Sequence, residues 1–219
     1  MKKGYLLVAF GSLLTLPVSS AQGQACIGLA SLATRPMNLL VSAEFTDGAK
    51  AFTGRFGFGS SIAFGGIRGS IVDYDDIDGT AKVIGADGGL SFITGAQRNI
   101  SFCPIVGLSY TNYPDIEILG NSYGSSSTDG EAGIALGATL DAGTMSLIPF
   151  GSLRGVYSRF DVDVPNSDSE SDTYGILSAG LSFVLSDAFL IRPIINIPLG
   201  LEGSDPSYGV GVSIGFGSR

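Results

Sequence analysis

Apolar residues recur at every second position in one segment after another of this 219-residue chain. The last segment shows the pattern most clearly, because its apolar residues alternate with glycine and serine: Tyr208, Val210, Val212, Ile214 and Phe216. A period of two places successive side chains on opposite faces of an extended strand. About ten segments of roughly 9–14 residues carry this pattern, and glycines throughout disfavour helices, so we predict an all-β fold.

The second face of these segments consists mostly of small residues. Glycine alone accounts for 33 residues, and charged residues make up only 15% of the chain. A soluble β-sandwich needs polar side chains on its water-exposed face, where glycine would weaken the strands. Small residues instead suit the crowded interior of a small closed barrel whose apolar outer face meets lipid. We therefore predict a closed antiparallel transmembrane β-barrel over residues 37–219, with about ten strands and eight as the alternative.

Residues 1–25 are typical of a cleaved signal peptide. Lys2 and Lys3 precede an apolar stretch over residues 5–18, which is too short to span a bilayer, and small residues follow it. We expect cleavage to leave residues 26–36 as a periplasmic N-terminal segment. Cleavage directly before Cys26 would also allow lipidation of this cysteine, and this alternative stays open.

The chain has two cysteines, Cys26 and Cys103. Two cysteines in an exported protein most often pair. If the first strand starts in the periplasm, the fifth strand also starts there, which places Cys103 at the same end of the barrel as Cys26. We predict a Cys26–Cys103 disulfide that ties the N-terminal segment to the rim or the interior of the barrel. Two free thiols are the alternative, besides lipidation.

Long polar connections follow mainly the odd-numbered predicted strands, as expected for outer loops. The longest are predicted at residues 114–128 and 162–172. Acidic residues gather in these outer connections: Asp73, Asp75, Asp76, Asp78, Asp161, Asp163, Asp168, Glu170 and Asp172. Their spacing differs from that of a helix-flanked calcium loop, so we interpret them as solvated surface acids and predict neither a metal nor a cofactor.

Five charged residues fall on the predicted inward faces: Glu44, Arg55, Asp87, Asp141 and Arg192. Charges in a narrow lumen must pair or stay hydrated. If they pair, they fill the lumen; if they stay hydrated, they line a narrow pore. A ten-stranded barrel is only slightly wider than the eight-stranded type that side chains fill, so a filled lumen is favoured.

In this pattern the sequence resembles the bacterial outer-membrane β-barrel proteins, in particular small barrels of the opacity and attachment-invasion kind. The resemblance covers roughly residues 37–217 and is most specific in the last strand. It implies that the barrel-assembly machinery recognises the alternating residues that end in Phe216, although Gly217, Ser218 and Arg219 follow here. It also implies contact with outer-membrane lipids.

Composition excludes several activities. The chain has no histidine and therefore lacks a catalytic Ser-His-Asp triad, a histidine base and histidine metal ligands. Its formal charge of −8 argues against nucleic-acid binding. We predict a monomeric, non-enzymatic outer-membrane barrel that acts in surface interaction or envelope integrity, through its acidic loops and toward an unidentified surface ligand. A narrow passive pore for small solutes or ions and a soluble secreted or periplasmic β-sandwich are the alternatives.

Overall fold

The computed structural model describes residues 25–29, 35–60, 62–75, 79–94, 100–118, 121–163, 169–186, 188–201 and 203–217. Residues 1–24 of the predicted signal peptide, and the predicted surface acids Asp76, Asp78 and Asp168, lie outside the described residues. Within the described ranges, no helix is both long enough and apolar enough to cross a membrane.

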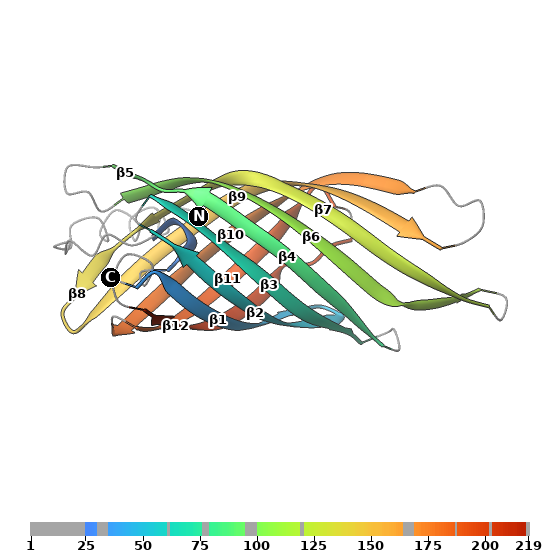
Figure 1. The fold of residues 1–219 in the computed structure, drawn as a ribbon, viewed down its shortest axis with the longest axis horizontal. Coiled ribbons are helices and arrows are strands. Elements are labelled where there is room, and N and C mark those ends of the chain that lie inside the picture. The colour runs from blue at the N-terminus through green and yellow to red at the C-terminus, as the bar shows by residue number, and fades with distance from the viewer. Residues whose placement is uncertain are drawn as a thin grey trace, which may run out of the picture.

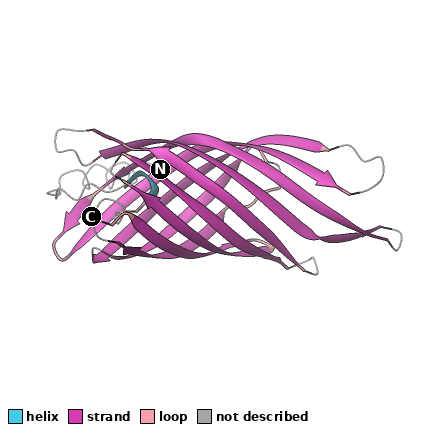
Figure 2. Ribbon diagram, viewed as in Figure 1, coloured by secondary structure: helices cyan, strands magenta, loops and turns pink. Residues whose placement is uncertain are grey.

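Ten long strands close into one antiparallel barrel over the described residues (Figures 1 and 2). They are β1 (Met37–Thr46), β2 (Ala49–Gly59), β3 (Ala63–Tyr74), β4 (Thr80–Leu90), β6 (Ile100–Ile118), β7 (Asn121–Ala138), β9 (Met145–Val162), β10 (Glu170–Ser186), β11 (Phe189–Leu199) and β12 (Ser207–Phe216). Each long strand pairs with the next along the chain, and β1 pairs with β12 to close the barrel. The closed ten-stranded barrel is confirmed, and the eight-stranded alternative is wrong.

Two three-residue strands prolong the long ones. β5 (Phe92–Thr94) continues β4 after Ser91 and pairs with β6, and β8 (Leu140–Ala142) continues β7 after Thr139 and pairs with β9. Both lie at the end of the barrel that also holds the 3₁₀ turn η2 (Ala25–Ile27) and the C-terminus (Figure 1). We call this end the plug end and the opposite end the hairpin end.

The outer surface of the barrel is apolar. All five apolar residues of β12 point outward, with exposed fractions from 36% at Phe216 to 60% at Tyr208, while Ser213 between them is buried. The same alternation exposes Leu39 and Val41 on β1. A closed sheet without free edges and with an apolar exterior is the form in which strands can cross hydrocarbon. The alternative of a soluble β-sandwich is wrong, because the sheet closes on itself and the apolar face points outward.

The structure shortens both long predicted loops, and the first of them is in large part strand. Residues 114–128 were expected to form an outer loop, but β6 continues to Ile118 and pairs with β7 from Asn121 onward, past one register shift. Likewise β9 reaches Val162 and β10 begins at Glu170. The backbones of a hairpin pair without needing an apolar face, and serine, threonine and tyrosine adopt the extended form readily next to a partner strand. The hairpins β6–β7 and β9–β10 therefore project at the hairpin end (Figure 1).

Candidate functional site

A short N-terminal segment, Ala25–Leu29, lies inside the barrel at the plug end and is called the plug here. Cys26 forms a disulfide with Cys103 of β6, with a Cα–Cα separation of 6.1 Å, and both cysteines are fully buried. This confirms the predicted disulfide. The hydroxyl of Ser182 on β10 donates a hydrogen bond of 2.7 Å to the carbonyl of Gly28. Leu29 belongs to the same buried apolar cluster as both cysteines.

Two glycines leave room for the plug. Gly28 has a φ of +69°, which disfavours other residues, and a Cβ there would lie 2.6 Å from the Phe150 ring. On β7, a Cβ at Gly137 would overlap the carbonyl of Ala25. The inner wall is thus shaped for this segment, and any side chain at position 137 would displace it.

An ion-pair cluster lies along the inner wall. Glu131 on β7 accepts a bond of 2.8 Å from Arg154 Nη1 on β9, and its other oxygen pairs with Arg68 Nη2 of β3 at 3.2 Å. Arg68 reaches Glu131 across β4 and β6, which lie between their strands. Glycines make this possible: a Cβ on Gly107 of β6 would overlap the Glu131 carboxylate, and one on Gly85 of β4 would lie 3.0 Å from Arg68 Nε.

A second pair repeats this construction. Arg55 on β2 binds both carboxylate oxygens of Asp87 on β4, with an Nε–Oδ1 distance of 2.9 Å. The strand between them, β3, carries Gly66, where a Cβ would lie 2.6 Å from Arg55 Cζ. Such two-point arginine–carboxylate pairs fix the orientation of both groups.

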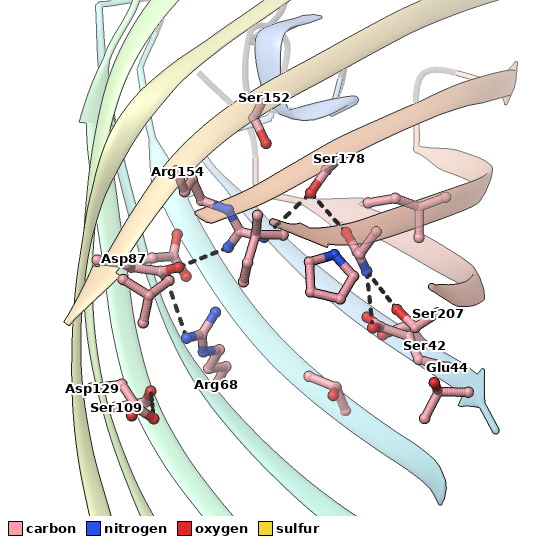
Figure 3. Close-up of a pocket in the computed structure, with 18 of the residues that line it drawn as sticks. Ser42, Glu44, Arg68, Asp87, Ser109, Asp129, Ser152, Arg154, Ser178 and Ser207 are labelled. Carbon is pink, nitrogen blue, oxygen red and sulfur yellow. Dashed lines mark hydrogen bonds and ion pairs between the residues drawn. The ribbon is translucent and has the colours of Figure 1, made fainter. Parts of the chain in front are cut away.

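Hydrogen bonds extend the Glu131 cluster around the barrel (Figure 3). Arg154 Nη2 donates to Ser178 Oγ at 3.3 Å, and Ser178 Oγ donates to Asn196 Oδ1 at 2.7 Å. Asn196 Nδ2 then donates to Glu44 Oε2 on β1 at 3.2 Å. We call this chain of six residues, from Arg68 through Glu131, Arg154, Ser178 and Asn196 to Glu44, the interior belt.

A cavity of about 760 Å³ lies inside the barrel. At the plug end, Ile27 and Leu29 of the plug line it together with Phe64 and Phe150. At the hairpin end, its lining includes the β1–β2 turn, residues 47–48, and residues 203–205 before β12. Between these ends the lining is charged and polar, because the interior belt and the Arg55–Asp87 pair face it.

Comparison with known proteins bears on the fold. No family model and no curated protein matches the sequence. The structure is similar to the translocator domain of autotransporter NalP from Neisseria meningitidis, with 12% identity, 83% of this chain and 89% of that chain covered, and a TM-score of 0.53. The chain therefore has the fold of an outer-membrane β-barrel.

Two further solved structures align with this barrel. One is the N-terminal β-barrel domain of Pseudomonas aeruginosa OprF, which is 14% identical. The alignment covers 84% of this chain and 99% of the OprF domain, with a TM-score of 0.38. The other is Ail of Yersinia pestis in complex with the heparin analogue sucrose octasulfate, which is 13% identical. The alignment covers 82% of this chain and 98% of Ail, with a TM-score of 0.41.

Four of the five charges predicted inside the barrel line its cavity: Glu44, Arg55, Asp87 and Arg192. Asp141 lies apart from it, on β8, where the Ser146 hydroxyl donates to its carboxylate at 3.2 Å. Asp141 is paired in register with Ser146, which shares the inward phase of Ile148 and Phe150, so Asp141 faces inward at the plug end, beyond the residues that line the cavity.

Sequence reasoning missed Arg68, Glu131 and Arg154, which carry most of the interior charge pairing. Glu131 lies two residues before Gly133 and so continues the inward phase of β7 just after the predicted loop 114–128. Arg68 lies two residues after Gly66 and therefore on the same inward face of β3, so the alternation in the sequence could also have identified it. Arg154 lies in a segment with apolar residues on both faces, which left its phase undefined.

The described acidic residues of the predicted outer loops lie at the hairpin end, on or beside strand ends: Asp73, Asp75, Asp161, Asp163, Glu170 and Asp172. Asp75 pairs with Lys50 Nζ at 2.9 Å, and Asp161 pairs with Arg159 at 3.4 Å. Both pairs are about half exposed and therefore contribute little stability. Among the described residues, no group of three or more acids and cysteines is placed to hold a metal ion.

Proposed function

We propose that this barrel is a non-enzymatic, non-conducting outer-membrane protein whose projecting hairpins act in surface interaction and envelope integrity. In this proposal the hairpin end faces outward and the plug end faces the periplasm. The observation that carries it is the length of four adjacent strands. β6, β7, β9 and β10 have 17–19 residues, whereas the other six long strands have 10–12, and about 9–11 residues suffice to cross a membrane.

The projection is ordered and polar. β4 pairs with β6 as far as Asn112, and β6 continues to Ile118, which adds about 20 Å of strand at roughly 3.3 Å per residue. Tyr113 and Phe160 pack edge to face across the two hairpins, with ring centroids 5.7 Å apart. The exposed acids Asp115 and Asp163 lie in this region. These features support a fixed acidic surface that a partner can contact.

The plug and the ion pairs support a sealed interior. The disulfide holds the plug in the lumen, and Arg55, Arg68 and Arg154 occupy the inner wall through carboxylate pairs. The absence of histidine from the sequence supports a non-enzymatic role. A narrow passive pore remains the second candidate, and the cavity of about 760 Å³ is the observation that favours it.

We expect the purified, oxidised barrel to give no steady single-channel conductance in planar bilayers. The plug closes one end of the lumen, so ions lack a continuous path. Insertion is checked on the same sample by heat-modifiable gel mobility, which separates a silent barrel from an absent one. Steady conductance of the oxidised protein would favour the passive pore.

Protease added to intact cells is expected to cut only within residues 114–128 and 162–172. Cuts within residues 94–99 or 141–144 would mean that the plug end faces outward.

As a test of the role itself, both hairpins are shortened to the length of the neighbouring strands. Cells carrying this variant are expected to bind surfaces less or to become more sensitive to detergent, while the barrel stays heat-modifiable. Unchanged adhesion together with unchanged detergent sensitivity would contradict the proposed role.

A further inference from the structure

We propose that the cavity binds a small organic monoanion with an apolar body, and that Arg192 is its main anion-binding residue. This binding site goes beyond the surface role of the hairpins and does not depend on it. Three properties of the cavity carry the proposal: the unmet hydrogen-bonding capacity of Arg192, the balance of charges around it, and the apolar surface of the plug beside it.

Arg192 has no ion pair with any described residue. Its guanidinium lies over the ring of Phe150, with Cζ 4.6 Å from the ring centroid, and its Nε is buried without a hydrogen-bond partner. A guanidinium carries only N–H donors, and a cation–π contact leaves most of these donors unused. An anion in the cavity would satisfy them.

The nearby carboxylates are already engaged. Arg192 lies within electrostatic range of Glu44, Asp87, Arg55 and Arg154. Asp87 uses both oxygens on Arg55, Glu131 divides its oxygens between two arginines, and Glu44 accepts from Asn196.

Nearest Arg192, three arginines face two carboxylates: Arg55, Arg154 and Arg192 against Glu44 and Asp87. One bound negative charge balances this local set, whereas the lining of the whole cavity has four arginines and six acids. A further acid, Asp129, lies one inward position nearer the hairpin end, where the hydroxyls of Ser109 and Ser158 donate to it. Buried donors without partners also occur at Arg154 Nε and Arg55 Nη1, so the unmet capacity is shared by three guanidinium groups of one cavity.

The floor of the cavity is apolar. β10 pairs Phe183 with Ile191, which puts Arg192 at the level of Ser182, whose hydroxyl holds the plug. Ile27 and Leu29 of the plug line the cavity at this end. A ligand whose charge binds Arg192 can therefore lay an apolar body on the plug, and the cavity volume is in the usual range for small-molecule sites.

The mouth of the cavity selects for low charge. Asp47 and Asp205 line it at the hairpin end, so an anion entering there passes two carboxylates. Hydrated carboxylates are screened and oppose a monoanion only weakly, but they oppose a multiply charged anion more strongly. These features favour an aliphatic or aromatic monocarboxylate as the ligand class.

The test uses 4-fluorobenzoate as the probe and the barrel in lipid nanodiscs, with ¹⁹F line broadening as the readout. We expect wild-type protein to bind 4-fluorobenzoate and not the neutral 4-fluorobenzamide. Arg192→Gln is expected to weaken benzoate binding about tenfold or more, because a charge-assisted contact is lost. Arg159→Gln, which removes an exposed arginine outside the cavity, serves as the matched control and should bind like wild type.

Heat-modifiable mobility shows that each variant is folded. Arg192→Gln removes an unpaired cation from the interior, so it should not prevent folding. Loss of binding in Arg192→Gln with retention in Arg159→Gln supports the site. Equal binding by wild type and Arg192→Gln, equal binding of the amide and the carboxylate, or no binding by the folded wild type would overturn it.

Discussion

Glu131→Gln is expected to lower the free energy of unfolding of the barrel by about 3 kcal/mol, the lower end of the cost of breaking a buried ion pair. Within the part of the chain that the structure describes, Glu131 is the only carboxylate paired with both Arg68 and Arg154, and its side chain is 11% exposed. Glutamine keeps the size of the side chain but leaves two guanidinium groups in the interior without a counter-charge. Removing one partner of a buried ion pair is far more costly than removing an exposed pair.

The measurement is the urea midpoint of the barrel in lipid vesicles, followed by circular dichroism and heat-modifiable mobility. Glu44→Gln is the matched control, because Glu44 also faces the cavity but accepts its hydrogen bond from the neutral Asn196. It should lose clearly less stability than Glu131→Gln. Equal losses in the two variants would show that the paired arginines are not what makes Glu131 important.

Replacing both Cys26 and Cys103 with serine should reduce the free energy of unfolding by about 4 kcal/mol. The disulfide joins residues 77 positions apart, and a loop of that length restricts the unfolded chain strongly. The bond is also fully buried at the centre of the plug contacts, so its loss weakens the attachment of the plug to β6.

Reductant provides the internal control for this second experiment. Wild-type protein unfolded with a thiol reductant present should approach the urea midpoint of the double serine variant, and the variant itself should not respond to reductant. A double variant that unfolds at the wild-type midpoint would contradict a stabilising role for the bond.

The strand pattern and the disulfide were predictable because they depend on local features. The alternation in residues 208–216 determines which side chains face outward. Odd-numbered predicted strands all start at the same end of an antiparallel barrel, which brings Cys26 and Cys103 together. The contacts of Arg68 with Glu131 were not predictable in this way. They join strands that are not neighbours, so they depend on the curvature and stagger of the closed sheet, which no single segment encodes.

The length of the hairpins was hidden for a different reason. Residues 113–118 and 121–126 lack a clear apolar alternation, because this part of the sheet is not required to present one face to lipid. Strand pairing continues the register set by Ile105 and Gly133 as far as Tyr113 and Ser125, and it shifts by one residue before Ile116 pairs with Tyr123. Asp141 keeps the inward phase of β7, because the register with β9 runs on unchanged through Thr139 into β8.

The position of the plug tether has a consequence for the order of events during biogenesis. The disulfide attaches the plug to β6, in the middle of the sheet, whereas the barrel closes where β1 meets β12. The N-terminal segment can therefore be seated on β6, β7 and β9 while the first and last strands are still apart. Once β12 pairs with β1, the lumen closes around an insert that is already in place, and no later step has to thread it through the finished ring.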